Sequence, residues 1–133
     1  MFFEVNFLAV IVATIVNCIL GMFWYSPRLF GTVWAKEHSF EPSSMEATPW
    51  HFISAIVVSF VTAYVFALLI HWIGIVKISE GVKLGILIWV GFIATTHFSG
   101  VIWAKRPWMA YVIDTGFQLV SMIIMGTILA SWL

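Results

Sequence analysis

The last hydrophobic segment of the chain carries polar side chains that could do chemistry inside a membrane. Asp114 and Gln118 lie one helical turn apart, and Ser121 continues the same helical face. A carboxyl group at membrane depth is costly, so it must face protein, water or a partner. Such a group of side chains could transfer protons or bind a cation.

Other polar residues are expected to lie at a similar depth in neighbouring segments. At about 1.5 Å per helical residue, Asp114 and His97 each lie about 9 Å from the turn that joins the last two segments. Asn17 lies about 12 Å from the same side of the membrane. The predicted intramembrane polar cluster comprises Asn17, Ser54, Ser59, His97, Asp114 and Gln118.

Two interpretations of this cluster remain open from the residues alone. In the first, Asp114 and His97 form the site of a small oligomeric channel or a proton-linked transporter. In the second, the cluster is a structural hydrogen-bond network that fixes how the helices pack, each link contributing about 0.6–2 kcal/mol. The structural interpretation is favoured, because Asp114 is a single carboxylate near the interface and the other membrane half has almost no polar residues.

Composition places these residues in a membrane protein. Of the 133 residues, 62% are hydrophobic and 9% are charged, whereas soluble domains average about 25% charged residues. Hydrophobic runs of about 20 residues can cross a bilayer. The sequence predicts an all-α membrane protein in which residues 1–133 form a single domain. Its four transmembrane helices, arranged as an antiparallel bundle, are expected at about 5–25, 50–72, 80–103 and 108–132.

Between the first two spans, an apolar face over about 27–37 predicts a short helix lying in the membrane interface. The first span lacks a basic leader and a small-residue cleavage site, so it is expected to be a retained helix rather than a cleaved signal.

Small residues recur at a spacing of four in three of the predicted spans and would let helices approach closely. A bundle of 15.0 kDa has little room for a conduit of its own, so we expect a homo-oligomer or a subunit of a larger membrane complex. The packing candidates are Ala9, Ala13, Gly21, Ala55, Ala63, Gly81 and Gly85.

The distribution of basic residues predicts the orientation in a bacterial inner membrane. Four Lys and Arg residues fall on the long-loop side and two on the terminal side, so the termini are expected outside.

Several function classes find no support in the sequence. The formal net charge is zero, so there is no electrostatic footprint for nucleic acid. The single cysteine forms no zinc or redox motif, and no metal site, cofactor or catalytic residue is predicted. An enzyme is the least favoured class, because only His97 and Asp114 could serve as acid and base.

The run GMFWYSPRLFGTVW at residues 21–34 resembles the end of the first helix in the DUF1761 family of small bacterial membrane proteins (domain of unknown function). The resemblance continues in Thr48-Pro49, in Arg106-Pro107-Trp108 and from Asp114 to Trp132, so it covers essentially the whole chain. It implies four spans and no established activity. The family pattern commonly has Asn at the position of Asp114, which implies that a carboxylate is not required there.

Overall fold

The structure is a computed structural model that describes residues 5–25, 49–105 and 107–132. Four of its helices are long and apolar enough to cross a membrane, and the described residues contain no β-strand. The expected all-α membrane fold is therefore confirmed. The predicted interfacial helix at 27–37 lies outside the described residues. The spans are α1 (Phe7–Trp24), α3 (Pro49–Ile73), a third span over Ile78–Trp103, and α6 (Trp108–Ser131).

Local chemistry accounts for where these helices begin and end. The Asn6 side chain caps α1 by accepting a hydrogen bond from the backbone N–H of Ala9 at 3.2 Å. Gly74 follows α3 with φ of 82°, and the N–H groups of Gly74 and Ile75 both bond to the carbonyl of Ile70. That left-handed position favours glycine and allows the short turn into the third span.

The third span is one continuous rod with a wider segment at its centre. It consists of α4 (Ile78–Ile88), the π-helix η2 (Trp89–Ala94) and α5 (Thr95–Trp103). The indole N–H of Trp89 donates to the carbonyl of Thr115 at 2.8 Å, and the Tyr111 hydroxyl donates to the carbonyl of Ala94 at 3.0 Å. A hydrogen bond between the third span and α6 therefore occurs at each end of the π segment.

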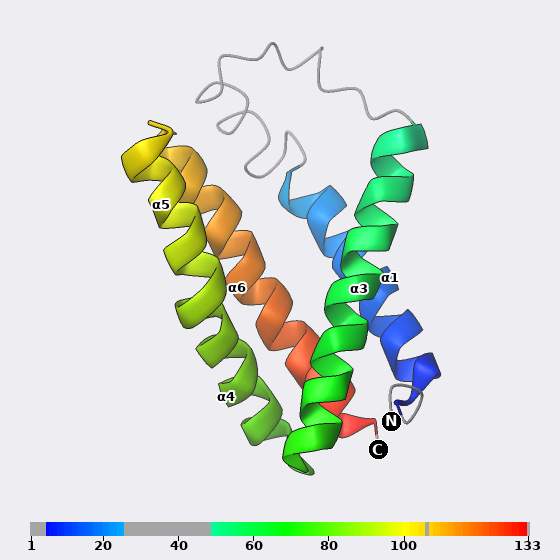
Figure 1. The fold of residues 1–133 in the computed structure, drawn as a ribbon. Helices are drawn as coiled ribbons and strands as arrows, with labels where there is room; N and C mark the ends of the chain where they lie inside the picture. The colour runs from blue at the N-terminus through cyan, green and yellow to red at the C-terminus, as the bar shows by residue number, and fades with distance from the viewer. Residues whose placement is uncertain (1–4, 26–48, 106, 133) are drawn as a thin grey trace.

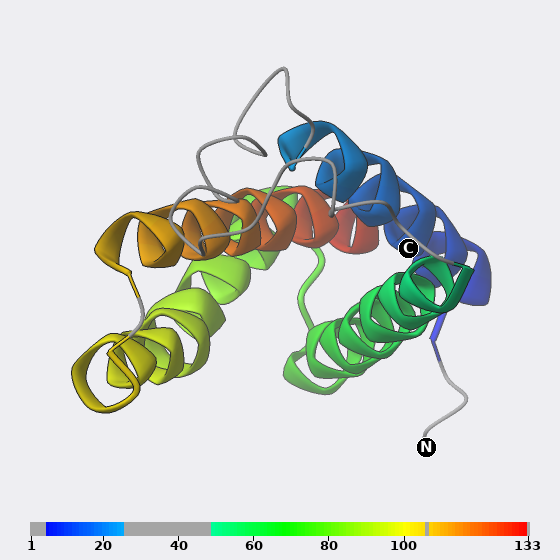
Figure 2. The same cartoon turned by 90° about the horizontal axis from the view of Figure 1, so that it is seen from above.

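Successive spans run in alternating directions, so that α1 begins and α6 ends at the same end of the molecule (Figure 1). We call this the terminal end and the opposite one the loop end. Helix α6 is central, because α4 packs most extensively against it and α1 and α3 also contact it. Seen from above, the yellow α5 and the green α3 lie apart from each other along the same side of α6 (Figure 2).

The apolar core lies in the half of the molecule near the terminal end. Its largest fully buried side chains are Val10, Phe66, Met122 and Met125. The two glycines of α4 lie at the closest helix crossing. A Cβ atom on Gly81 would be 2.7 Å from the carbonyl oxygen of Gly126.

The other packing candidates are divided between the core and the open part of the structure. Ala9, Ala13 and Ala63 are buried in the core. Gly21 lies against the ring of an aromatic residue of α6. Ala55 is exposed and lines a groove instead of a packed contact. Small residues in α1 and α3 thus pack tightly only toward the terminal end.

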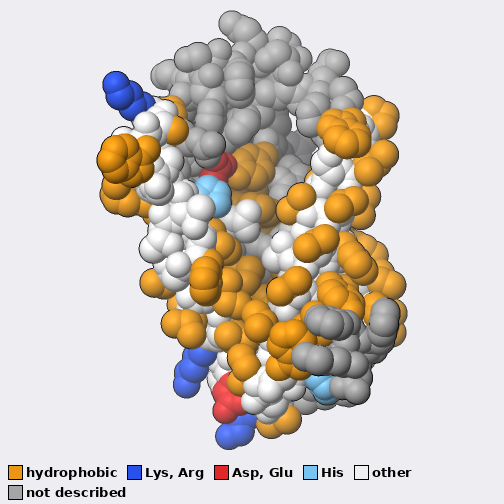
Figure 3. Space-filling model, in the orientation of Figure 1, with side chains coloured by type: hydrophobic (Ala, Val, Ile, Leu, Met, Phe, Trp, Pro, Cys, Tyr) orange, Lys and Arg blue, Asp and Glu red, His pale blue; other side chains and the backbone are white. Residues whose placement is uncertain are grey.

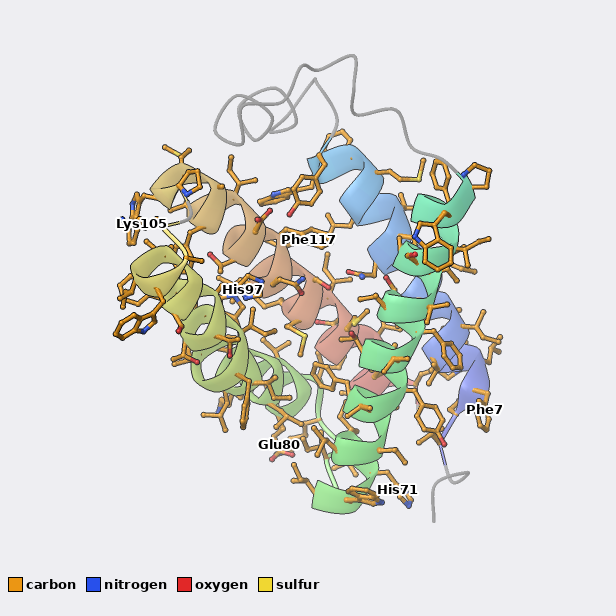
Figure 4. All side chains as sticks on the ribbon, turned by 45° about the horizontal axis from the view of Figure 1, so that its top comes forward. Phe7, His71, Glu80, His97, Lys105 and Phe117 are labelled. Carbon is orange, nitrogen blue, oxygen red and sulfur yellow. The ribbon has the colours of Figure 1, made fainter. Side chains whose placement is uncertain are left out.

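The outer surface is apolar around the body of the molecule. Figure 3 shows hydrophobic side chains over much of the described part of the displayed face, with Lys side chains near its two ends. Lys105 and Glu80 are labelled at opposite ends of the third span in Figure 4. Phe92 and Trp103 of the third span are 74% and 83% exposed, which suits a helix surface that faces lipid.

Candidate functional site: an intramembrane polar groove

A hydrogen-bond network centred on Asn17 joins three spans. The side-chain N–H of Asn17 in α1 donates to the hydroxyl oxygen of Ser59 in α3 at 2.8 Å. The hydroxyl of Ser121 in α6 donates to the Asn17 side-chain oxygen. The thiol of Cys18 makes a longer contact of 3.7 Å with the same Ser59 oxygen. One amide is therefore hydrogen-bonded to two other helices at once.

Asp114 is held by a residue of the first span. The Tyr25 hydroxyl donates to a carboxylate oxygen of Asp114 at 2.6 Å. Beside it, the indole N–H of Trp24 donates to the carbonyl of Ile113 at 3.1 Å. The ring of Phe117 packs edge-on against Tyr25, with ring centroids 5.5 Å apart. In Figure 4, Phe117 extends from α6 on the side of α1.

His97 is satisfied within its own helix. Its Nδ1 lies 2.9 Å from the carbonyl oxygen of Ile93, and since a carbonyl only accepts, this nitrogen carries the hydrogen. Both His97 and Asp114 are described and partly buried, and no hydrogen bond joins them. The structure thus pairs Asp114 with α1 rather than with the preceding span.

The remaining two members of the predicted cluster make no polar contact. Ser54 and Gln118 are both partly buried, and within the described parts of the chain neither side chain has a hydrogen-bond partner. Gln118 lies about 15 Å from the start of α6, which is near the middle of a hydrocarbon core about 30 Å thick.

A groove of about 350 Å³ lies between α1, α3 and α6 toward the loop end. The polar residues in its wall include the whole Asn17 network and Gln118, and none of the described residues that line it is charged. The apolar wall includes Met22, Phe52 and Phe117. The network is therefore on the edge of an open space and is not sealed inside the core.

Several residues that make close contacts in the structure were not in the predicted polar cluster or among the packing candidates. They are Cys18, Trp24, Tyr25 and Ser121 in this region, and Gly126 at the crossing of α4 and α6. Tyr25 lies at the end of the first span, and from this position its hydroxyl reaches a carboxylate one or two turns deep. The role of Gly126 in helix packing could have been predicted from the sequence, because Gly126 and Ala130 are four residues apart, the same small-residue spacing as Gly81 and Gly85. Among the described residues, no group of three His, Cys, Asp or Glu side chains could hold a metal ion.

The four apolar helices and their polar contacts at membrane depth define a multi-pass membrane protein. The chain belongs to the family described as "Protein of unknown function (DUF1761)", whose model matches residues 8–130. The resemblance noted from the sequence motifs is thereby confirmed. No curated protein and no solved structure matches the chain.

Proposed function

We propose that this protein is a structural or accessory membrane subunit whose intramembrane polar contacts fix the packing of its helices. The observation that carries the proposal is the Asn17 side chain, which is hydrogen-bonded to α3 and to α6 at once. Asp114 and His97 also have partners within the protein. Polar groups that are hydrogen-bonded in this way hold the helices at fixed relative heights. They are engaged with the protein and do not serve as steps for moving protons or ions.

Ion flux through reconstituted protein tests this proposal against transport. A small channel or proton-linked transporter using Asp114 and His97 is the second candidate, favoured by the partial exposure of both side chains. We expect proteoliposomes with wild-type protein or with Asp114→Asn to conduct protons and cations no faster than empty liposomes. Flux in the wild type that is lost in a folded Asp114→Asn variant would instead establish transport.

The third span supports the proposal of a homo-oligomer or larger complex. Only 6% of its most apolar window is buried within the protein, and its main contact is α6. A helix that buries so little of itself has a large surface for a second protein or a second copy.

Cysteine cross-linking in native membranes tests which surface is used. In a Cys18→Ser background, Phe92→Cys on the third span is expected to give cross-linked dimers. Ile19→Cys on α1, which is 61% exposed, is the matched control and is expected to remain monomeric. Equal cross-linking at both positions, or none at either, would contradict an interface on the third span.

We also propose that the protein lies in a bacterial inner membrane with both termini on the outer side. By sequence position, Lys77 and Lys83 are assigned to the terminal side, and Arg28, Lys36, Lys105 and Arg106 are assigned to the long-loop side. A C-terminal alkaline phosphatase fusion should therefore be active, and an inactive one with an active cytoplasmic reporter would reverse the orientation.

A further inference from the structure

The groove between α1, α3 and α6 contains hydrogen-bonding groups that the protein does not use. No described residue bonds to the Gln118 amide, which has two N–H donors and an acceptor oxygen. Ser59 is 5% exposed, and its oxygen accepts from Asn17 and Cys18. The hydrogen of the Ser59 hydroxyl can turn either to the Cys18 sulfur or to a group in the groove.

These unused groups require a partner that the bilayer itself does not supply. Hydrocarbon cannot hydrogen-bond to an amide, and an unpaired polar group there costs several kcal/mol. Gln118 lies near mid-bilayer by its position in α6, so it is far from interfacial water. A molecule in the groove that carries oxygen acceptors would give the Gln118 amide N–H and the Ser59 hydroxyl a hydrogen-bond partner.

The wall of the groove restricts the chemistry of that molecule. No charged residue is among the described residues that line it, so it offers nothing to neutralise an ionic group. Phe52 and Phe117 provide aromatic surface from two different helices. On α3 the lining runs from Phe52 to Thr62, which is about 15 Å of helix. The space is elongated and of a size typical for small-molecule sites.

The depth of the groove in the membrane distinguishes between a phospholipid and an uncharged molecule as the source of the oxygen acceptor. The ester carbonyls of a phospholipid are tied to a charged head group at the interface, whereas Asn17 and Gln118 lie about 12–15 Å below it. A molecule without a charged head group can reach that depth without carrying charge into hydrocarbon.

We infer that the groove between α1, α3 and α6 binds an uncharged, lipid-soluble molecule. Its carbonyl or hydroxyl oxygen accepts hydrogen bonds from Gln118 and Ser59, and its apolar body packs against Phe52 and Phe117. This inference does not depend on the proposed role as an accessory subunit, since a ligand can occupy the groove whether or not the protein assembles.

Equilibrium binding of a radiolabelled decyl-substituted benzoquinone tests the inference. The probe is uncharged, has two carbonyl acceptors and has an apolar tail. The protein is placed in phosphatidylcholine nanodiscs, so that phospholipid is already present in large excess, and binding to empty nanodiscs is subtracted. We expect saturable binding of one probe per protomer.

Two variants and one control connect that binding to the groove. Gln118→Leu is expected to weaken probe binding about three- to tenfold, as the loss of a neutral hydrogen bond does. It should also raise the thermal unfolding midpoint of the empty protein, because an unpaired amide is removed. Ala55→Phe should fill the groove and abolish binding. Val57→Phe places the same ring on the exposed outer face of α3 and should leave binding unchanged.

The absence of saturable binding in phosphatidylcholine nanodiscs would overturn the inference, and phospholipid would then be the better candidate occupant. Binding that survives both Ala55→Phe and Gln118→Leu would overturn it as well, because the probe would then sit elsewhere. Should Ala55→Phe fail to fold, Gln118→Leu alone decides the outcome.

Discussion

Replacing Gly81 with alanine should separate the two helices that pack most closely in this protein. A Cβ atom on Gly81 would lie 2.6 Å from the Cβ of Ala130 and 2.7 Å from the carbonyl oxygen of Gly126. Ordinary van der Waals contact begins at 3.4 Å, so α4 and α6 must move apart by about 0.8 Å or more. Neither contacting atom belongs to a flexible side chain that could turn away.

The expected cost follows from that geometry. Overpacking of a well-packed contact costs about 1–3 kcal/mol, while alanine in place of glycine within a helix returns up to about 1 kcal/mol. Since the clash involves backbone on the facing helix, we expect the clash to win and the protein to lose about 1–2 kcal/mol of stability.

Reversible unfolding in mixed micelles, followed by circular dichroism, measures this loss. Gly91→Ala is the matched control, because the same methyl group there would meet no atom within 4 Å. We expect Gly91→Ala to leave stability unchanged or slightly higher. If Gly81→Ala is as stable as Gly91→Ala, the close approach of α4 and α6 is refuted.

Two further perturbations test individual hydrogen bonds by the same unfolding measurement. Trp89→Phe should remove the bond to the Thr115 carbonyl and cost about 0.6–1.7 kcal/mol; an unchanged midpoint would mean that this bond does not tie the π segment to α6. Tyr25→Phe should cost about 1–3 kcal/mol by leaving Asp114 without its donor, while Asp114→Asn keeps an acceptor oxygen for Tyr25 and should cost less. A larger loss for Asp114→Asn than for Tyr25→Phe would show that the carboxylate acts through something other than this bond.

The fold was accessible from sequence because hydropathy is a direct signal in a membrane protein. Four long apolar runs separated by Pro27, Gly74 and Pro107 predict four spans, and backbone hydrogen bonding in lipid leaves only helix for them. Depth along each helix also placed Asn17 and Ser59 in the same membrane half. Their contact follows once α1 and α3 pack together.

The partners of individual polar groups could not be predicted by the same means. Depth places His97 and Asp114 at similar heights, but it contains no information on which way each side chain points around its helix. The structure orients Asp114 toward Tyr25, the residue that follows α1, and His97 bonds to Ile93 of its own span. Rotation about a helix axis is decided by packing, which hydropathy does not report.

The π segment and the groove also arise from tertiary structure. Nothing in the sequence WVGFIA over residues 89–94 marks a wider helical turn. At its start, the Trp89 indole donates a hydrogen bond to α6, and at its end the Ala94 carbonyl accepts one from α6. Likewise, Gly81 and Gly126 draw the helices together near the terminal end, whereas the wall residue Gln118 borders open space.

A double-mutant cycle between Asn17 and Ser121 is the most direct test of whether the polar network holds the spans together. Unfolding free energies would be measured for wild type, Asn17→Ala, Ser121→Ala and the double variant. We expect a coupling energy of about 0.6–1.7 kcal/mol, the range found for hydrogen bonds between membrane helices. A coupling energy indistinguishable from zero, with all four proteins folded, would contradict a structural role for this network.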